Sequence, residues 1–193
     1  MFLQRQRDTH VYFLCSDVTD TGHSDARYIF TRTKEILDIV DEFLALGVQA
    51  KNIFLMGQSA GGWSSLMAMQ QANKKFNAAI VFAPACCNKR ELKDKKRGKY
   101  RKRNRPHQER EMLKAKRIEA LVFAYEDDVF NRPQDLTFLT DAYPESVEMI
   151  GYHCGEGHFT YQKDCQFTEN KARIAGYITD RKEDFQRRKF KPS

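Results

Sequence analysis

Five short apolar runs, separated by longer amphipathic stretches, constrain the fold of this chain more than any other feature. The runs cover His10–Ser16, Asn52–Met56, Ala78–Ala83, Ala120–Tyr125 and Val147–Tyr152. Each run is apolar almost throughout, which is typical of a strand covered on both faces. Alternation of such strands with helices builds a parallel sheet. We therefore predict an α/β fold, with a mostly parallel sheet flanked by helices on both faces.

The stretches between the runs show helical spacing of apolar residues. Ile29, Thr33, Leu37, Val40 and Leu44 recur at intervals of three and four and predict a helix that ends before Gly47. Gly62–Gln71 is apolar over most of its circumference, as in a buried central helix. Two further amphipathic helices are predicted over Pro133–Tyr143 and Thr168–Arg187.

The length of 193 residues fits a single domain over residues 1–193. The longest apolar run falls well short of the roughly 18 residues of a membrane span, and the N-terminus does not resemble a signal peptide. Five cysteines, an odd number, favour a reduced cytoplasmic protein. A Cys154–Cys165 disulfide in an exported protein stays an alternative. The oligomeric state is left open.

One segment of the chain is strongly basic. Residues 89–117 hold 15 Lys and Arg against four Asp and Glu, a net charge of +11, so the remainder of the chain is mildly acidic at −4. Almost nothing in this segment is apolar before Met112 and Leu113. We expect an exposed loop or a short cap inserted at about 88–117. Clustered Lys and Arg can neutralise the phosphates of a nucleic acid, so nucleic-acid binding stays possible at this segment. A solvated insertion is the favoured interpretation.

A serine motif follows the run Asn52–Met56. In Gly57-Gln58-Ser59-Ala60-Gly61 the serine stands between a predicted strand and a predicted helix, which is the context that exposes the nucleophile of a G-x-S-x-G turn. Gly57 and Gly61 are expected to remove side chains that would collide where strand and helix pass closely. Ala60 is small, and its backbone N–H can point at an oxyanion.

A serine nucleophile needs a base and an acid. Sites of open α/β sheets lie at the carboxyl ends of the strands, and Ala120–Tyr125 ends in Glu126-Asp127-Asp128. Asp128 is the preferred acid and Asp127 the alternative. The last predicted strand leads into His153-Cys154-Gly155-Glu156-Gly157-His158, whose glycines permit a tight turn. His158 is the preferred base, because His153 sits within the strand end and is expected to be a packed core residue.

Together these motifs resemble the α/β-hydrolase superfamily, nearest its dienelactone-hydrolase-like branch. The resemblance rests on Gly57-Gln58-Ser59-Ala60-Gly61, on Tyr125-Glu126-Asp127-Asp128 and on Gly157-His158-Phe159, and it runs from about Val11 to the C-terminus. It implies a Ser59, Asp128, His158 triad that hydrolyses a small-molecule carboxylic ester or related acyl bond through an acyl-enzyme, without a cofactor. Tyr125 replaces the glycine of the family's Gly-x-x-Asp strand end.

The resemblance also implies strands ahead of the first run. Members of the superfamily carry such strands, and the loop after their third strand supplies a second oxyanion donor. Too few residues precede Val11 to contain them, so the fold is expected to be N-terminally short. The loop from Cys15 to His23 is the suggested substitute donor. Loss of one donor lowers kcat by about 10²–10³, so impaired activity is expected if nothing replaces it.

Three other functions are weighed against the hydrolase. His153, Cys154, His158 and Cys165 are acceptable zinc ligands, but their spacing is not the usual paired pattern. The glycines around Ser59 lack the Lys-Ser/Thr ending of a phosphate loop, which argues against nucleotide binding. A non-catalytic or weakly active hydrolase-fold protein that binds a small molecule or a polyanion remains the alternative function.

Overall fold

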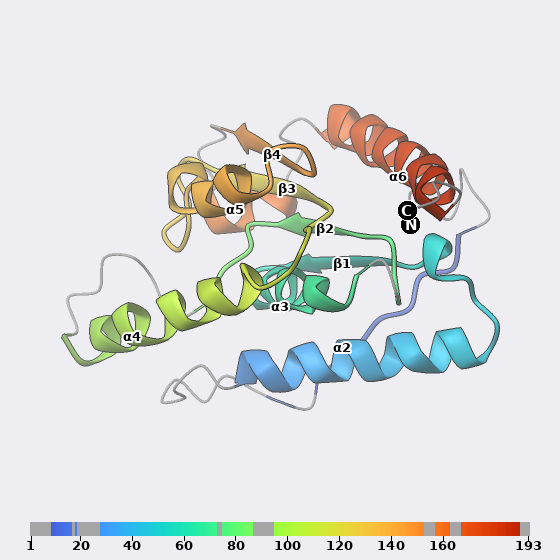
Figure 1. The fold of residues 1–193 in the computed structure, drawn as a ribbon. Helices are drawn as coiled ribbons and strands as arrows, with labels where there is room; N and C mark the ends of the chain where they lie inside the picture. The colour runs from blue at the N-terminus through green and yellow to red at the C-terminus, as the bar shows by residue number, and fades with distance from the viewer. Residues whose placement is uncertain are drawn as a thin grey trace.

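Four of the five predicted strands form one parallel sheet in the computed structural model (Figure 1). The structure describes residues 9–16, 18, 28–72, 75–86, 95–152, 157–162 and 167–189. The strands are β1 (Phe54–Gln58), β2 (Ala78–Phe82), β3 (Ala120–Tyr125) and β4 (Val147–Tyr152). They lie in the order β1-β2-β3-β4, and every neighbouring pair is parallel. The predicted α/β fold is confirmed.

The register of the sheet brings the carboxyl ends of the strands to one edge. Gln58 at the end of β1 pairs with Phe82 at the end of β2, and Phe82 pairs with Phe123 near the end of β3. Tyr125 pairs with Tyr152 where β3 and β4 end. The loops that follow these strands therefore start close together in space, although they are far apart in sequence.

Helices cover both faces of the sheet. One face packs against α2 (Tyr28–Ala45), α3 (Ala60–Ala68), the C-terminal end of α4 (Lys95–Met112) and α5 (Thr137–Ala142). The other face, with Ile80, Leu121 and Phe123, packs against Ile174 of α6 (Phe167–Lys189). Figure 1 shows α2 and α3 on the side of the sheet opposite α6. Each central strand thus meets side chains on both faces, which accounts for its continuous apolar sequence.

The ends of α2 and α3 follow from local sequence. Gly47 lies at φ 89°, its N–H donates to the Leu44 carbonyl over 3.0 Å, and the Val48 N–H donates to the Phe43 carbonyl over 3.0 Å. This is a Schellman ending, which glycine favours because the left-handed conformation costs it little. After Ala68, α3 tightens into the 3-10 turn η2 (Met69–Gln71). The predicted ends of both helices are close to those observed.

Of the exposed loop or short cap expected at 88–117, the exposed loop is wrong for residues 95–112. Residues 95–112 form α4, and its inward side chains Arg105, Gln108 and Met112 are buried. Gln108 accepts a hydrogen bond of 2.7 Å from the Trp63 indole N–H on α3. The sequence of α4 shows no apolar stripe in its described half, because two of the three side chains just named are polar. Residues 88–94 lie outside the described part of the chain.

The predicted strand His10–Ser16 is also wrong. These residues have no strand pairing, and Tyr12 and Phe13 are mostly exposed. The Tyr12 ring packs edge-on against Phe43 of α2, with 5.4 Å between ring centroids. The apolar run therefore lies against a helix instead of joining the sheet, and sequence composition does not distinguish these two environments.

The remaining described elements are short. They are the 3-10 turns η1 (Ala50–Asn52), η3 (Pro133–Asp135) and η4 (Gly157–Gln162). Among the residues described, none of the helices has the length and apolar character needed to cross a membrane. Cys15 is exposed and free, and Cys86 is buried and disulfide-bonded. The alternative Cys154–Cys165 pairing falls outside the described residues.

Candidate active site

Ser59 stands on a strained turn between β1 and α3. Its backbone has φ 53° and ψ −123°, a conformation that residues with a side chain rarely adopt. The Ser59 N–H donates to the Phe82 carbonyl over 3.0 Å, while its carbonyl accepts from the N–H groups of Trp63 and Ala85 over 2.9 and 3.1 Å. These three bonds hold the turn in place, so the strain is maintained by the sheet and the helix together.

The glycines of the motif differ in what they do. A Cβ on Gly57 would lie 2.5 Å from the Gly61 carbonyl carbon and 2.7 Å from the Gly62 nitrogen, which no side chain permits. A Cβ on Gly62 would meet the Gly57 carbonyl oxygen at 3.1 Å. A Cβ on Gly61 would meet nothing within 4 Å. The close approach expected at Gly57 is present, but the expectation for Gly61 is wrong. The helix residue whose own Cβ would approach the Gly57 backbone is Gly62.

His158 lies directly opposite Ser59. Its Nε2 is 2.7 Å from the Ser59 Oγ, and its Nδ1 is 2.9 Å from the Asp128 Oδ2. The imidazole and the Asp128 carboxylate are both buried. With the proton on Nδ1 donated to Asp128, Nε2 is left as an acceptor for the serine hydroxyl. The structure thus brings Ser59, His158 and Asp128 into one hydrogen-bonded chain.

The backbone around His158 explains how the ring reaches this position. Gly157 has φ 56°, and a Cβ there would lie 2.7 Å from the Asp127 carbonyl oxygen. The turn can therefore press against the loop after β3 only because residue 157 has no side chain. Gln58 Nε2 donates to the His158 carbonyl over 3.3 Å. The Phe130 ring covers the imidazole, with 4.3 Å between centroids.

The two acidic candidates occupy different environments. Asp128 is fully buried, and its Oδ1 accepts a 2.6 Å hydrogen bond from the Phe130 N–H, which leaves Oδ2 for His158. Asp127 is exposed, and its backbone carbonyl underlies Gly157. Asp128 is the residue whose carboxylate reaches His158. The alternative base, His153, lies outside the described residues.

Ala60 is the first residue of α3. The N–H groups in the first turn of a helix have no acceptor within the helix, and they carry the positive end of its dipole. The Ala60 N–H is therefore in a suitable place for negative charge that develops beside Ser59. Most of the loop suggested for a second donor, Cys15–His23, falls outside the described residues.

Residues that the sequence did not single out hold the acid loop. Asn131, three positions after Asp128, is fully buried, and its Nδ2 donates to the Pro84 carbonyl over 2.8 Å. Its Oδ1 accepts from the Arg105 guanidinium, which also donates to the Asp135 carbonyl. Arg105 lies over the Trp63 ring, 5.6 Å from its centroid. No sequence motif marks Asn131 or Arg105, because their roles depend on contacts across 26 residues.

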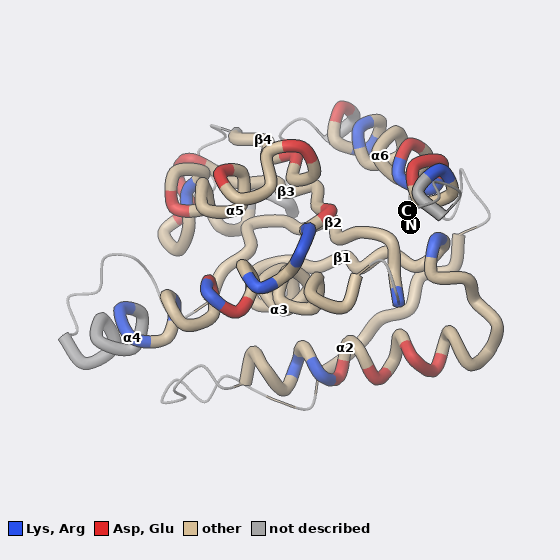
Figure 2. Tube along the Cα trace, viewed as in Figure 1, with Lys and Arg blue, Asp and Glu red and all other residues tan. Residues whose placement is uncertain are grey.

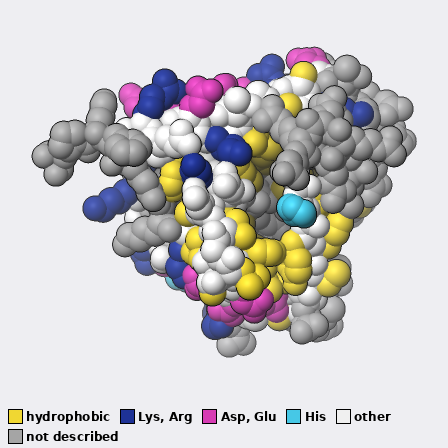
Figure 3. All heavy atoms as spheres, turned by 90° about the vertical axis from the view of Figure 1, so that its right-hand side faces the viewer, with side chains coloured by type: hydrophobic (Ala, Val, Ile, Leu, Met, Phe, Trp, Pro, Cys, Tyr) yellow, Lys and Arg dark blue, Asp and Glu magenta, His cyan; other side chains and the backbone are white. Residues whose placement is uncertain are grey.

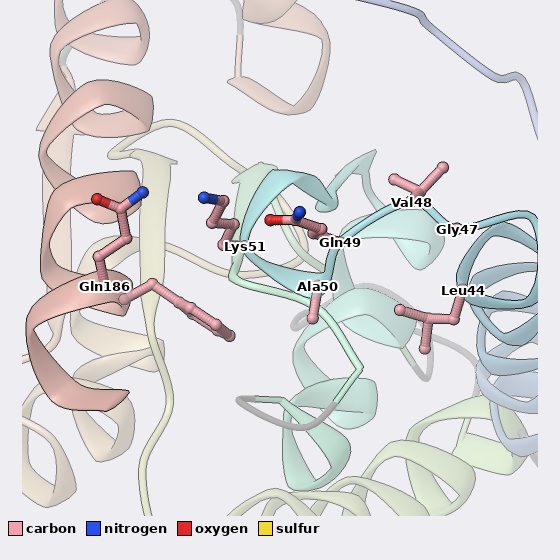
Figure 4. A pocket seen from close by; sticks show the side chains of 8 residues that line it. Leu44, Gly47, Val48, Gln49, Ala50, Lys51 and Gln186 are labelled. Carbon is pink, nitrogen blue, oxygen red and sulfur yellow. The ribbon is translucent and has the colours of Figure 1, made fainter. Parts of the chain in front are cut away.

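A groove lies at the other end of β1 from Ser59. Leu44, Gly47 and Val48 line it after α2, Gln49, Ala50 and Lys51 line it around η1, and Phe185 and Gln186 line it from α6 (Figure 4). Figure 3 shows the side of the molecule that faces right in Figure 1, where hydrophobic side chains gather in the lower half. Because η1 precedes β1 and Ser59 follows it, this groove is not continuous with the serine.

Within the described residues, no three His, Cys, Asp or Glu side chains lie close enough together to hold a metal ion. The residues of the zinc arrangement considered from the sequence lie, apart from His158, outside that part of the chain.

Comparison with known families identifies the chain. Residues 30–129, just over half of the sequence, match the prolyl oligopeptidase family. The chain belongs to that family. The region that matches includes the serine turn and the acid loop as far as Asp128, whereas His158 lies beyond it. The α/β-hydrolase superfamily predicted from the motifs is confirmed, and the match does not specify the dienelactone-hydrolase-like branch.

Solved structures share the fold of this family member. SOBER1 of Arabidopsis thaliana is 20% identical, with a TM-score of 0.53 over 81% of this chain and 65% of SOBER1. Paleococcus ferrophilus monoacylglycerol lipase is 13% identical, with a TM-score of 0.60 over 79% of this chain and 76% of the lipase. Porphyromonas gingivalis dipeptidyl peptidase 4 is 21% identical, with a TM-score of 0.55 over 78% of this chain and 22% of the peptidase.

The chain spans under two thirds of the length of SOBER1. No match was found among curated proteins. The family and the fold are those of serine hydrolases.

Proposed function

We propose that the chain is a serine hydrolase that cleaves a carboxylic ester or a related acyl bond of a small-molecule substrate. Ser59 is the nucleophile, His158 the general base and Asp128 the acid that orients it. The observation that carries the proposal is the hydrogen-bonded chain from Ser59 Oγ to His158 Nε2 at 2.7 Å and from His158 Nδ1 to Asp128 Oδ2 at 2.9 Å. Both distances are those of hydrogen bonds. The first lets Nε2 take the serine proton, and the second orients the imidazole while Asp128 stays ionised.

The first half of the reaction forms an acyl-enzyme. His158 Nε2 takes the Ser59 hydroxyl proton as Oγ attacks the acyl carbon, and the Asp128 carboxylate stabilises the imidazolium that results. The negative charge moves to the former carbonyl oxygen, where the Ala60 N–H can donate to it. His158 then gives its proton to the leaving oxygen or nitrogen as the bond to it breaks.

The second half returns the serine. A water molecule gives a proton to His158 Nε2 and attacks the acyl carbon, and the Ser59 oxygen leaves with the proton that His158 returns. Every step uses protons already present at Ser59, His158 or water, so no cofactor enters the proposal. An alcohol or amine in place of the water would make the same site an acyltransferase, and product analysis with an added acceptor separates the two outcomes.

The test is covalent labelling with a fluorophosphonate probe, together with turnover of a short-chain p-nitrophenyl ester. We expect the wild type to be labelled and to hydrolyse the ester, and Ser59→Ala to do neither. Ser65→Ala is the matched control, since Ser65 lies on α3 and its hydroxyl donates to the Gly61 carbonyl over 2.9 Å. Absence of labelling in folded wild-type protein would overturn the proposal and favour a non-catalytic binding protein.

A further inference from the structure

The outer face of α4 carries cations that its own carboxylates do not neutralise. The helix sequence Lys95–Met112 holds nine Lys and Arg and two Glu, a net charge of +7, which equals the net charge of the whole chain. Both Glu residues are engaged, Glu109 with Arg105 at 2.5 Å and Glu111 with Lys114 at 2.6 Å. Figure 2 shows the basic residues on the described part of α4 and on the segment leading into β3.

The buried contacts of α4 fix which side faces solvent. Arg105, Gln108 and Met112 point inward and are buried, at the spacing of one helix face. Lys102, Arg103 and Arg110 are exposed on the remaining surface, and Lys116 is exposed just after the helix. Within the described residues, none of these four forms an ion pair with a carboxylate. The helix is thus held in place by its buried side, and its solvent side carries three exposed cations without an ion-pair partner within the described residues.

We propose that this face of α4 binds the phosphate backbone of a nucleic acid, without reading its sequence. Lys and Arg in a row neutralise phosphates and release the counterions that surround them, which supplies most of the affinity of non-specific binding. From Lys102 to Arg110 the helix rises about 12 Å at 1.5 Å per residue, which spans about three to four phosphates of one strand at 3.4 Å spacing.

An anionic membrane is a poorer partner for the same surface. A helix that lies in a membrane interface needs an apolar face opposite its basic face. The apolar side of α4 is already occupied by the core through Met112, and the sequence from Lys95 to Asn104 holds Tyr100 as its one aromatic or aliphatic residue. The outer face therefore carries positive charge but lacks the apolar side chains that would insert among lipid chains.

The experiment measures fluorescence anisotropy of a labelled single-stranded RNA and a labelled DNA duplex, each about 20 nucleotides long and so longer than the helix. Titrations run between about 50 and 200 mM salt, the range over which such binding weakens strongly. The variant Lys102→Gln/Arg103→Gln removes two exposed cations. We expect it to reduce the log–log salt slope by about 1.8 on the duplex and about 1.4 on the single strand.

A charge-matched control is Lys34→Gln/Lys182→Gln, which removes two exposed cations from α2 and α6. This control should leave the salt slope unchanged, and Ser59→Ala should bind like the wild type, so the result is independent of catalysis. The proposal is overturned if neither nucleic acid binds at low salt. It is also overturned if the salt slope of the control falls as much as that of the α4 variant. Equal competition by polyglutamate, or binding only to phosphatidylserine vesicles, would also overturn it.

Discussion

The side-chain amide of Asn131 donates to the backbone carbonyl of Pro84 over 2.8 Å, so the loop that carries Asp128 is tied to the loop that follows β2. Because the Pro84 loop also meets the serine turn, through the Ala85 N–H and the Ser59 carbonyl, the two halves of the candidate site share one support. This connection is fully buried at Asn131.

Asn131→Ala should destabilise the protein. The change leaves the Pro84 carbonyl and part of the Arg105 guanidinium without their partner, at a cost of about 1–3 kcal/mol. Urea unfolding measures the loss. Asn104→Ala is the matched control, because the Asn104 Nδ2 is buried without a hydrogen-bond partner in the described structure, so its removal should change stability little. Equal losses in the two variants would contradict the role given to Asn131.

Asp128→Asn should impair ester hydrolysis, and Asp127→Asn should leave it nearly unchanged. An amide at position 128 cannot stabilise the imidazolium and favours the wrong tautomer of His158, so kcat should fall by about 10⁴. Asp127 is exposed, and its substitution should leave kcat within a few-fold of the wild type. Steady-state kinetics on one ester substrate measure kcat for both variants. A larger loss of kcat in Asp127→Asn than in Asp128→Asn would assign the role of the acid to Asp127.

Gly57→Ala and Gly61→Ala form a second matched pair. The added methyl at position 57 would lie 2.5 Å from backbone, and the one at position 61 would meet nothing within 4 Å. We expect Gly57→Ala to be poorly folded. Gly61→Ala should be as stable as the wild type or more so, by up to about 1 kcal/mol, since Gly61 lies in a helix. Thermal unfolding of both proteins checks the pair, and similar melting temperatures would refute the crossing described for Gly57.

Ser59→Gly should be more stable than Ser59→Ala. Both variants lack the hydroxyl, but only glycine adopts φ 53°, ψ −123° without strain, which costs other residues about 1–3 kcal/mol. Comparison of the two urea midpoints isolates the backbone effect, because neither variant can form the bond to His158. Identical midpoints would mean that the turn relaxes once the serine is removed.

Tyr177→Phe should weaken the alkaline sensitivity of the fold. Burial of the Tyr177 hydroxyl is the main cause that raises its pKa well above the ordinary value near 10, and Arg181 opposes the shift. The folded protein then keeps the proton while the unfolded chain loses it. The contribution of Tyr177 to stability is therefore complete below pH of about 10 and is lost as pH rises above that value.

Unfolding free energies measured between pH 8 and pH 11 test this expectation. The decline should be shallower in Tyr177→Phe than in the wild type, because phenylalanine has no proton to lose. At neutral pH the variant should be at least as stable, since the Tyr177 hydroxyl is buried without a hydrogen-bond partner in the described structure. A steeper decline in the variant would contradict the assignment.

The sequence predicted those elements whose environment is uniform along their length. β2 and β3 are buried almost throughout, so their apolar runs mark them directly. The predicted apolar residues Ile29, Leu37, Val40 and Leu44 of α2 are buried or partly buried against the core. The same criterion failed at His10–Ser16, where an equally apolar run lies against one helix and is otherwise exposed. An apolar run predicts that a segment packs against another part of the protein, but it does not predict whether that part is a strand or a helix.

Chain order and residue type predict part of the candidate site. Ser59, His158 and one acid after β3 follow from those alone. The difference between Asp127 and Asp128 does not, because it depends on which side of the loop is buried. The helix α4 was missed because the residues that fix it, Arg105 and Gln108, are polar and bind partners on other elements. Long-range polar contacts of this kind produce no periodic pattern of apolar residues in the sequence.

The close approach of Gly157 to the Asp127 carbonyl makes a residue without a side chain as necessary to the candidate site as Ser59 or His158. Any L-residue at position 157 would have to move the loop beneath it or leave φ 56°, and either change would withdraw the imidazole from the serine. In a library with every substitution at every position, selected for ester cleavage, position 157 should be depleted as severely as position 59. Tolerance to mutation in this family member is then set by backbone shape as much as by reactive groups.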